Sequence, residues 1–161
     1  MWKLEADMTT PHPGCRVPAE QFPLLGMDIS ETRIGLAICE HIQSPPHPLF
    51  TYVRRTRAED LARCVDWVQR YQIGAVVIGL PLNMDGTPGP RVQWMRRFAR
   101  ELAERVAVPM HMQDERLSTV EADEMMQAQG LDRLERAERV DAVAAALILQ
   151  RFLTEQCVDG L

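Results

Sequence analysis

The continuous apolar run Gly-Ala-Val-Val-Ile-Gly-Leu at residues 74–80 constrains the fold of this chain more than any other feature. The run is rich in β-branched residues, which favour a strand. It shows no alternation of polar and apolar side chains, and this is typical of a strand that is covered on both faces. Helices on both sides of a sheet provide that cover, so the run predicts an α/β protein.

The segments around this run predict the other elements. Further strands are expected at residues 24–29, 33–39, 49–54 and 109–113. The short turn Ser30-Glu31-Thr32 predicts that the first two form a hairpin. Helical spacing of apolar residues predicts helices at residues 58–71 and 90–106. A capping box at residues 118–121 and a stop at Gly130 predict a helix at residues 118–130. An alanine-rich apolar segment predicts a last helix at residues 140–153, after a charged connection at residues 132–139. This order predicts a mixed five-stranded sheet, in which a three-strand antiparallel meander precedes αβ units and helices cover both faces.

The length of 161 residues suits one domain with a substantial core. Residues 1–22 contain three prolines and no periodicity, so we expect a flexible N-terminal arm there. The domain is then expected at residues 23–156 and a C-terminal tail at residues 157–161. The arm has no apolar signal-peptide core, and the longest apolar run, residues 142–149, is too short to span a membrane. We therefore expect a cytoplasmic protein.

The cysteines, Cys15, Cys39, Cys64 and Cys157, are widely scattered and include no CxxC pair. A disulfide framework or a zinc site would need closer, paired spacing, so we expect reduced thiols that lie mostly in the core. The four histidines are equally scattered and give little support to a histidine-based metal site.

The net charge of −5 does not favour nucleic acid as a partner, but the basic residues are unusual. Lys3 is the only lysine among 18 basic residues, and arginine offers a planar fork that fits phosphate. Most arginines are expected on helix surfaces, balanced by nearby glutamates. The group Arg54, Arg55 and Arg57, at a strand end, is the better phosphate candidate.

Three acidic positions invite a functional interpretation beside a structural one. Asp28 interrupts an apolar strand, and either binds a metal or caps the hairpin turn. Glu115 follows the strand at 109–113 and either binds a ligand at the strand end or forms a surface salt bridge. Asp141 lies in the predicted first turn of the last helix, where the helix dipole alone would favour it. Carboxylates that converge from separate elements suit Mg²⁺ or Mn²⁺, and a two-metal phosphodiesterase needs such a set.

The sequence resembles the YqgF/RuvX family over about residues 24–154. The motifs that carry the resemblance occur in the family's order: residues 25–28 (LGMD) with 33–37 (RIGLA), 79–86 (GLPLNMDG), 114–119 (DERLST) and 140–145 (VDAVAA). Two positions depart from the family pattern. Ser30 stands where glycine is usual, and Cys39-Glu40 stands where Ser-Asp is usual.

The resemblance implies an RNase H-like nuclease that processes pre-16S ribosomal RNA or resolves Holliday junctions. It implies that Asp28, Glu115 and Asp141 form the catalytic set, with Asp28 on the central strand, and that they bind Mg²⁺ or Mn²⁺, which we expect as two ions. Substrate contacts are expected from the loop after residue 80 and from nearby side chains: Arg33, Asn83, Asp85, Gly86, Arg116 and Thr119. For the loop at residues 83–90, a plain turn is the alternative.

The expected partner is nucleic acid, either an RNA precursor or branched DNA, and the residues do not distinguish the two. A resolvase that cuts two strands symmetrically would be expected to form a homodimer. Two other functions stay open at this point. One is a non-catalytic module that binds RNA or DNA, and the other is an actin-like nucleotide-binding domain, because Asp28 and its turn also resemble the phosphate hairpin of that fold.

Overall fold

A computed structural model describes residues 15–83, 85–115 and 118–157, and it confirms the predicted sheet. The strands are β1 (Leu24–Ile29), β2 (Arg33–Cys39), β3 (His47–Val53), β4 (Ala75–Leu80) and β5 (Met110–Asp114). Their spatial order is β3-β2-β1-β4-β5. The first three strands form an antiparallel meander, and β1, β4 and β5 run parallel to one another. The predicted meander followed by αβ units is therefore correct, and β1 is the central strand.

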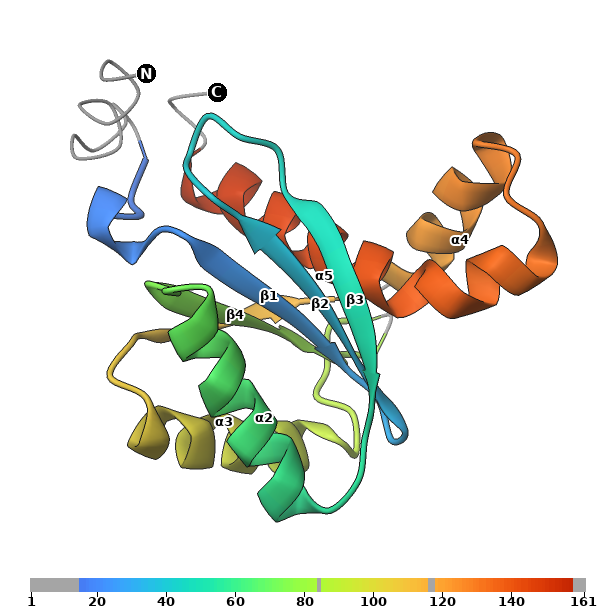
Figure 1. Ribbon diagram of the computed structural model, residues 1–161. Helices are drawn as coiled ribbons and strands as arrows, with labels where there is room; N and C mark the ends of the chain where they lie inside the picture. The colour runs from blue at the N-terminus through green and yellow to red at the C-terminus, as the bar shows by residue number, and fades with distance from the viewer. Residues whose placement is uncertain (1–14, 84, 116–117, 158–161) are drawn as a thin grey trace.

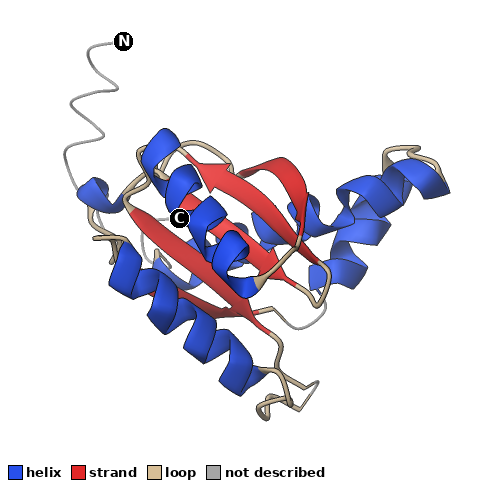
Figure 2. Ribbon diagram, turned by 60° about the horizontal axis from the view of Figure 1, so that its bottom comes forward, coloured by secondary structure: helices blue, strands red, loops and turns tan. Residues whose placement is uncertain are grey.

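Helices cover both faces of this sheet, as expected (Figure 1, Figure 2). The helices are α2 (Arg57–Arg70), α3 (Val92–Arg105), α4 (Ser118–Ala128) and α5 (Arg133–Gln156), and a short 3-10 helix, η1, spans Ala19–Gln21. Helices α2 and α3 lie on one face, while α5 crosses the other (Figure 1). Gly130, with φ +82°, ends the α4 segment as predicted, because its left-handed conformation suits glycine.

The charged connection predicted at residues 132–139 is wrong, since α5 begins at Arg133. The side chain of Asp132 caps this helix by accepting a hydrogen bond from the backbone N–H of Glu135, at 2.9 Å. Residues 133–135 and 137–139 are exposed, because this part of the helix lies beyond the sheet. Capping, and not burial of an apolar face, starts the helix there, so apolar periodicity did not reveal it.

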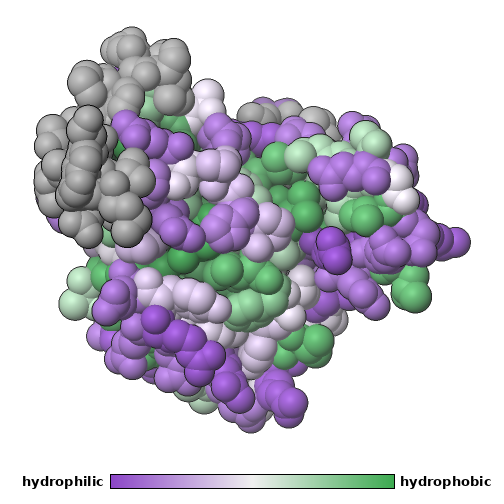
Figure 3. Space-filling model, turned by 45° about the horizontal axis from the view of Figure 1, so that its top comes forward, coloured by the Kyte–Doolittle hydropathy of each residue, from purple (hydrophilic) through white to green (hydrophobic). Residues whose placement is uncertain are grey.

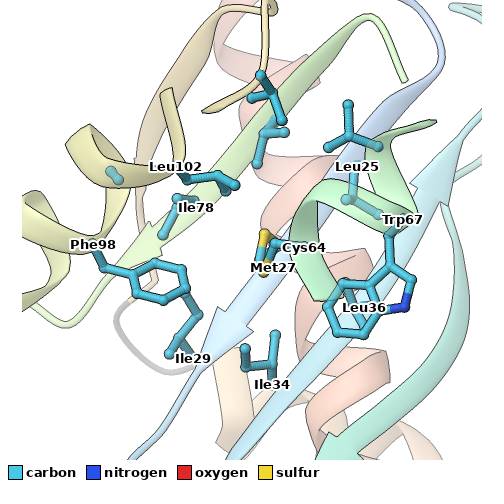
Figure 4. Packing of buried hydrophobic residues seen from close by; sticks show 14 of the residues in the cluster. Leu25, Met27, Ile29, Ile34, Leu36, Cys64, Trp67, Ile78, Phe98 and Leu102 are labelled. Atoms are coloured by element: carbon cyan, nitrogen blue, oxygen red, sulfur yellow. The ribbon is translucent and has the colours of Figure 1, made fainter. Parts of the chain in front are cut away.

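The alternating side chains of β1 divide the interior into two cores. Leu25, Met27 and Ile29 face α2 and α3, where they pack with side chains such as Trp67 and Phe98 (Figure 4). On the other face, Leu24 belongs to the core that includes Leu149 and Phe152 of α5. β4 contributes to both cores in the same way. The prediction that residues 74–80 are covered on both faces is therefore confirmed.

The segment before β1 lies against the domain where the structure describes it. Val17 is buried in the core beneath α5, and the backbone N–H of Arg16 donates to the carbonyl of Gln156 at 3.0 Å. Residues 15–22 are therefore packed, although the sequence assigned them to a flexible arm, and residues 1–14 lie outside the described part. Packing of Val17 explains the difference, since one apolar residue gives no periodic signal.

The expectation of four reduced thiols is wrong for one pair, since Cys15 and Cys157 form a disulfide. These cysteines lie 142 positions apart in the sequence, and the fold alone brings them together. Local spacing therefore could not reveal the pair. Cys39 and Cys64 are free and buried, as expected.

Helix α4 and the first turns of α5 project from the body of the molecule (Figure 1). A groove of about 660 Å³ lies between β3, α4 and α5. Phe50 and Met125 line it and are partly exposed. Figure 3 shows hydrophobic residues at the surface beside this projecting part. Within the described residues, no helix is both long and apolar enough to cross a membrane.

Candidate active site

Asp28 lies near the end of β1 and is 7% exposed. In the β1–β2 ladder it stands opposite Gly35. Helix α5 packs so closely there that a Cβ on Gly35 would collide with the backbone carbonyl of Asp141. A glycine is therefore required at Gly35, because only its missing side chain lets α5 bring Asp141 beside Asp28.

The hairpin turn after Asp28 has its own cap. The Ser30 hydroxyl accepts a hydrogen bond from the backbone N–H of Arg33 at 3.0 Å, and the two residues also pair through Ser30 N–H and Arg33 carbonyl at 2.8 Å. Asp28 is therefore not needed as the turn's cap, which removes its structural alternative. Ser30 can also replace the glycine that is usual in the family, because the turn does not use a positive φ at this position.

Glu115 directly follows β5 and reaches Asp28 on β1 across the end of the intervening strand β4. Its backbone N–H donates to the carbonyl of Leu80 at 3.1 Å, which continues the β4–β5 pairing by one residue. A Cβ on Gly79 would lie 3.0 Å from both Cβ and Oε2 of Glu115. The Glu115 side chain thus lies over Gly79, and its carboxyl group hydrogen-bonds to that of Asp28.

Burial raises the pKa of both Asp28 and Glu115. Burial raises the pKa of Asp28, the hydrogen bond from Glu115 lowers it, and the nearby charge of Asp141 raises it. Burial, followed by the hydrogen bond and charge of Asp28, raises the pKa of Glu115 to about 9. Arg91 lowers the pKa of both groups. Without a cation the pair therefore shares a proton at neutral pH.

Asp141 lies about two turns inside α5, since this helix begins at Arg133. The first-turn explanation for Asp141 is therefore wrong. Arg33 Nε lies 2.8 Å from Asp141 Oδ2. The contact is an ion pair that is not aligned as a hydrogen bond, and the buried Oδ2 atom has no hydrogen-bond partner in the described part of the chain. A buried carboxylate oxygen in this state is suited to an additional ligand.

The three acids offer the donors that a hard cation needs. Among the described side chains, no three Asp, Glu, His or Cys residues already form a metal-holding group. Asp28 and Glu115 are instead held together by a proton, and Asp141 is drawn to Arg33. A divalent cation can replace such a proton, and oxygen ligands are those that Mg²⁺ and Mn²⁺ prefer. The three carboxylates are therefore ligands of the kind that either ion takes.

The predicted substrate contacts lie in three different situations. Arg33 is at the site, paired with Asp141 and with a side chain that is 46% exposed. Asn83, Asp85 and Gly86 build the loop after β4: Asn83 Nδ2 donates to Thr87 Oγ1 at 3.0 Å, Thr87 Oγ1 donates to Asp85 Oδ1 at 2.6 Å, and Gly86 has φ +88°. These contacts account for the loop as a turn. Arg116 and the side chain of Thr119 lie outside the described residues.

The proposed phosphate site at Arg54, Arg55 and Arg57 is not supported. Arg54 Nε pairs with Asp60 Oδ2 at 3.0 Å, and Arg57 Nε pairs with Glu101 Oε2 at 2.8 Å. The strand end instead carries a paired structural network around Asp60, which is fully buried.

Sequence reasoning did not single out Arg91, whose charge acts on Asp28 and Glu115, or the two glycines beside which the acids pack. A detectable signal exists for Gly35 and Gly79. Each interrupts a β-branched or apolar strand beside the strand that carries Asp28, and an interior strand glycine often marks close approach of another group.

Comparisons with known proteins identify relatives of this chain. A nuclease candidate for pre-16S rRNA from Anaeromyxobacter dehalogenans (strain 2CP-1) is 46% identical over 129 residues, which are 80% of this chain and 94% of the relative. A protein of the same description from Moorella thermoacetica is 39% identical over 138 residues, which are 86% of this chain and 99% of the relative.

Solved structures of resolvases share the fold. RuvC of Thermus thermophilus in complex with a Holliday junction has a TM-score of 0.53 at 18% identity, over 80% of this chain and 93% of that one. The Fowlpox virus resolvase bound to junction DNA also has a TM-score of 0.53, at 9% identity, over 83% of this chain and 98% of that one. The predicted RNase H-like fold is thus confirmed. Residues 23–155 match the RuvX family, described as Holliday junction resolvase, and the chain belongs to this family.

Proposed function

We propose that the chain is a nuclease that hydrolyses phosphodiester bonds, with Asp28, Glu115 and Asp141 as its catalytic acids. The observation that carries this proposal is the approach of three acids to one site: α5 packs against Gly35, opposite Asp28, at the backbone of Asp141, and the Glu115 side chain lies over Gly79 with its carboxyl group directed to that of Asp28. Acids that repel one another are costly to bury, and an evolved fold retains such a group where a cation or a reaction uses it.

The same acids would hold Mg²⁺ or Mn²⁺, which we expect as two ions. When bound, such an ion lowers the pKa of a coordinated water and offsets the charge that develops on the leaving oxygen. The chain's own contribution is position: β1, the end of β5 and α5 supply one carboxylate each. Rigid elements hold these groups, and Arg33, whose partly exposed side chain pairs with Asp141, holds that carboxylate at the rim of the site.

For the substrate we propose precursor 16S ribosomal RNA, because the relatives that are 36–46% identical are described as candidate nucleases for it. We place this reaction in the cytoplasm. Branched DNA is the second candidate, because the family is described as a resolvase and the matched structures include junction complexes. A junction resolvase would act as a homodimer, whereas an RNA processor could act as a monomer. The expected substrate contacts at Asn83, Asp85, Gly86, Arg116 and Thr119 belong to this proposal.

One assay panel tests the proposal. Purified chain is incubated with Mg²⁺, Mn²⁺ or EDTA, and with a labelled RNA that carries the 16S 5′ flank beside a labelled four-way DNA junction. We expect cleavage that requires the cation and that Asp28→Asn abolishes. Glu104→Gln is the matched control, because Glu104 is an exposed acid on α3.

The outcomes separate the candidate functions. Cleavage of the RNA supports processing, and symmetric cleavage of the junction supports resolution. Binding of either nucleic acid without cation-dependent cleavage would leave the non-catalytic module as the better description. Retained cleavage in purified Asp28→Asn protein would overturn the assignment of the acids.

A further inference from the structure

Arg91 differs from the other arginines near the candidate site. Ion pairs occupy the guanidinium groups of Arg33, Arg54 and Arg57. Arg91 is only partly buried, and its side chain forms no hydrogen bond or ion pair with any residue that the structure describes. A free guanidinium beside buried acids is suited to an anionic ligand, because its charge is not already neutralised.

The backbone places Arg91 at the same end of the parallel strands as the acids. β4 ends at Leu80, and the following loop returns to Arg91, the residue directly before α3. Glu115 pairs with Leu80 at this end, and Asp28 lies near the end of the parallel strand β1. The positive charge of Arg91 acts on both Asp28 and Glu115 without a direct contact to either. A phosphate could therefore lie between the guanidinium and the acids.

Trp94 supports the guanidinium of Arg91. The Arg91 Cζ atom lies 5.7 Å from the centroid of the indole ring, which itself stacks on Phe98 at 5.4 Å. A cation over an aromatic face is stabilised, and its side chain loses less freedom when it binds a ligand.

The surroundings of Trp94 carry an excess of positive charge. Arg54 and Arg57 lie over the same ring, with Cζ atoms 4.5 Å and 5.3 Å from its centroid. Asp60 and Glu101 neutralise these two arginines, which leaves the charge of Arg91 unbalanced. Arg57 also has a buried Nη2 atom with no hydrogen-bond partner in the described chain. An anion at Arg91 would offset the excess.

We propose that Arg91 binds a non-bridging oxygen of a backbone phosphate in the nucleic acid, next to the bond that the acids cut, with Trp94 as its support. This inference rests on the proposed function. It adds the path of the bound nucleic-acid strand, which runs from Asp28, Glu115 and Asp141 toward the first turn of α3. The ligand class is a phosphodiester backbone, since the guanidinium fork matches phosphate oxygens in either RNA or DNA.

The test measures binding separately from cleavage. Every protein carries Asp28→Asn to prevent cutting, and the probe is a fluorescein-labelled single-stranded RNA with Mg²⁺ held constant. Arg91→Gln, Arg91→Lys and the control Arg100→Gln are compared over a series of salt concentrations. Arg100 is exposed on α3, so its substitution removes the same charge from the same helix.

We expect Arg91→Gln to weaken binding about tenfold and to reduce the slope of log affinity against log salt by about 0.7, which is the loss of one phosphate contact to a single strand. Arg91→Lys should keep the slope but lose part of the affinity, because an ammonium keeps the charge without the planar fork. A purely structural role for Arg91 would not produce this separation.

Equal affinity and slope for Arg91→Gln and Arg100→Gln would overturn the inference, as would absence of RNA binding by the Asp28→Asn parent. The proposed function is judged by a different result, which is cleavage by the wild-type chain. Wild-type cleavage with an unaffected Arg91→Gln variant would refute only the phosphate contact. Loss of binding in Arg91→Gln without wild-type cleavage would support the contact and refute the nuclease.

Discussion

Two buried aspartates in this fold have opposite surroundings. Asp60, at the start of α2, accepts hydrogen bonds from Tyr52 Oη at 3.0 Å and the backbone N–H of Arg55 at 2.9 Å on one oxygen, and from Arg54 Nε at 3.0 Å on the other. Asp28, on β1, instead faces Glu115 and Asp141, which are acids themselves. A carboxylate with complete partners holds a structure together, whereas one among other acids is available for a ligand.

The largest expected effect is a loss of cleavage when one of the three acids at the candidate site is replaced. Asp141→Asn should reduce cleavage by about 10²- to 10⁴-fold, because several kcal/mol of transition-state stabilisation depend on the cation site. The fold should persist, since Asn is isosteric and Arg33, the partner that is left, is half exposed. Single-turnover cleavage rates and a thermal melt would check this. Cleavage within a few-fold of wild type would remove Asp141 from the catalytic set.

Removal of the carboxylate at Asp60 should affect stability instead. Asp60→Ala leaves the largely buried Arg54 without its carboxylate, since the Arg54 side chain is only 13% exposed. Loss of one partner of a buried pair costs about 3–5 kcal/mol. Urea unfolding measures this cost, and cleavage per folded molecule should remain near wild type at low temperature. A stable but inactive Asp60→Ala protein would contradict the comparison.

The three acids of the candidate site should also make the stability of the chain depend on pH. Glu115 has a pKa of about 9 in the folded chain, above its unfolded value, so the folded state holds an extra proton between about pH 4.5 and 9. This contribution to stability is complete below that window and is lost as the pH rises through it, by at most about 1.4 kcal/mol per pH unit.

Glu115→Gln should remove this loss, so the cation-free variant should be more stable than wild type at pH 8 and similar at pH 4.5. Added Mg²⁺ should reverse the order at pH 8 by binding the wild-type acids. Denaturant unfolding at both pH values, with EDTA or Mg²⁺, measures the effect. Parallel pH profiles for the two proteins would show that Glu115 does not carry the shared proton.

The smallest expected effect on cleavage comes from filling the space between Gly79 and the Glu115 side chain. Gly79→Ala would bring a Cβ within 2.6 Å of Ile148 Cδ1 and 3.0 Å of Glu115 Oε2, so the acid must shift. We expect about 1–3 kcal/mol of destabilisation from overpacking and a several-fold lower cleavage rate. Gly130→Ala is the control, because a Cβ there meets no atom within 4 Å and only the positive φ is strained. That control should cost about 1 kcal/mol and leave the cleavage rate unchanged.

Local patterns in the sequence were enough for the sheet, whereas the set of three acids was predicted through the resemblance to the family. Apolar runs and turn residues located β1, β2 and β4, since burial of a strand acts on each residue directly. Asp28 was identifiable because a carboxylate in an apolar strand is costly wherever its partners lie.

Contacts between distant segments were decided only by the tertiary structure. The cap at Asp132 extended α5 by two turns and thereby placed Asp141 inside the helix. Gly35 leaves the space in which this helix packs against the sheet, and the fold brings Cys15 and Cys157 together. Asp60 forms an ion pair with Arg54, which the sequence had suggested as a phosphate ligand. Periodicity reports which face of an element is buried, but the partner that covers a given atom depends on how the elements pack.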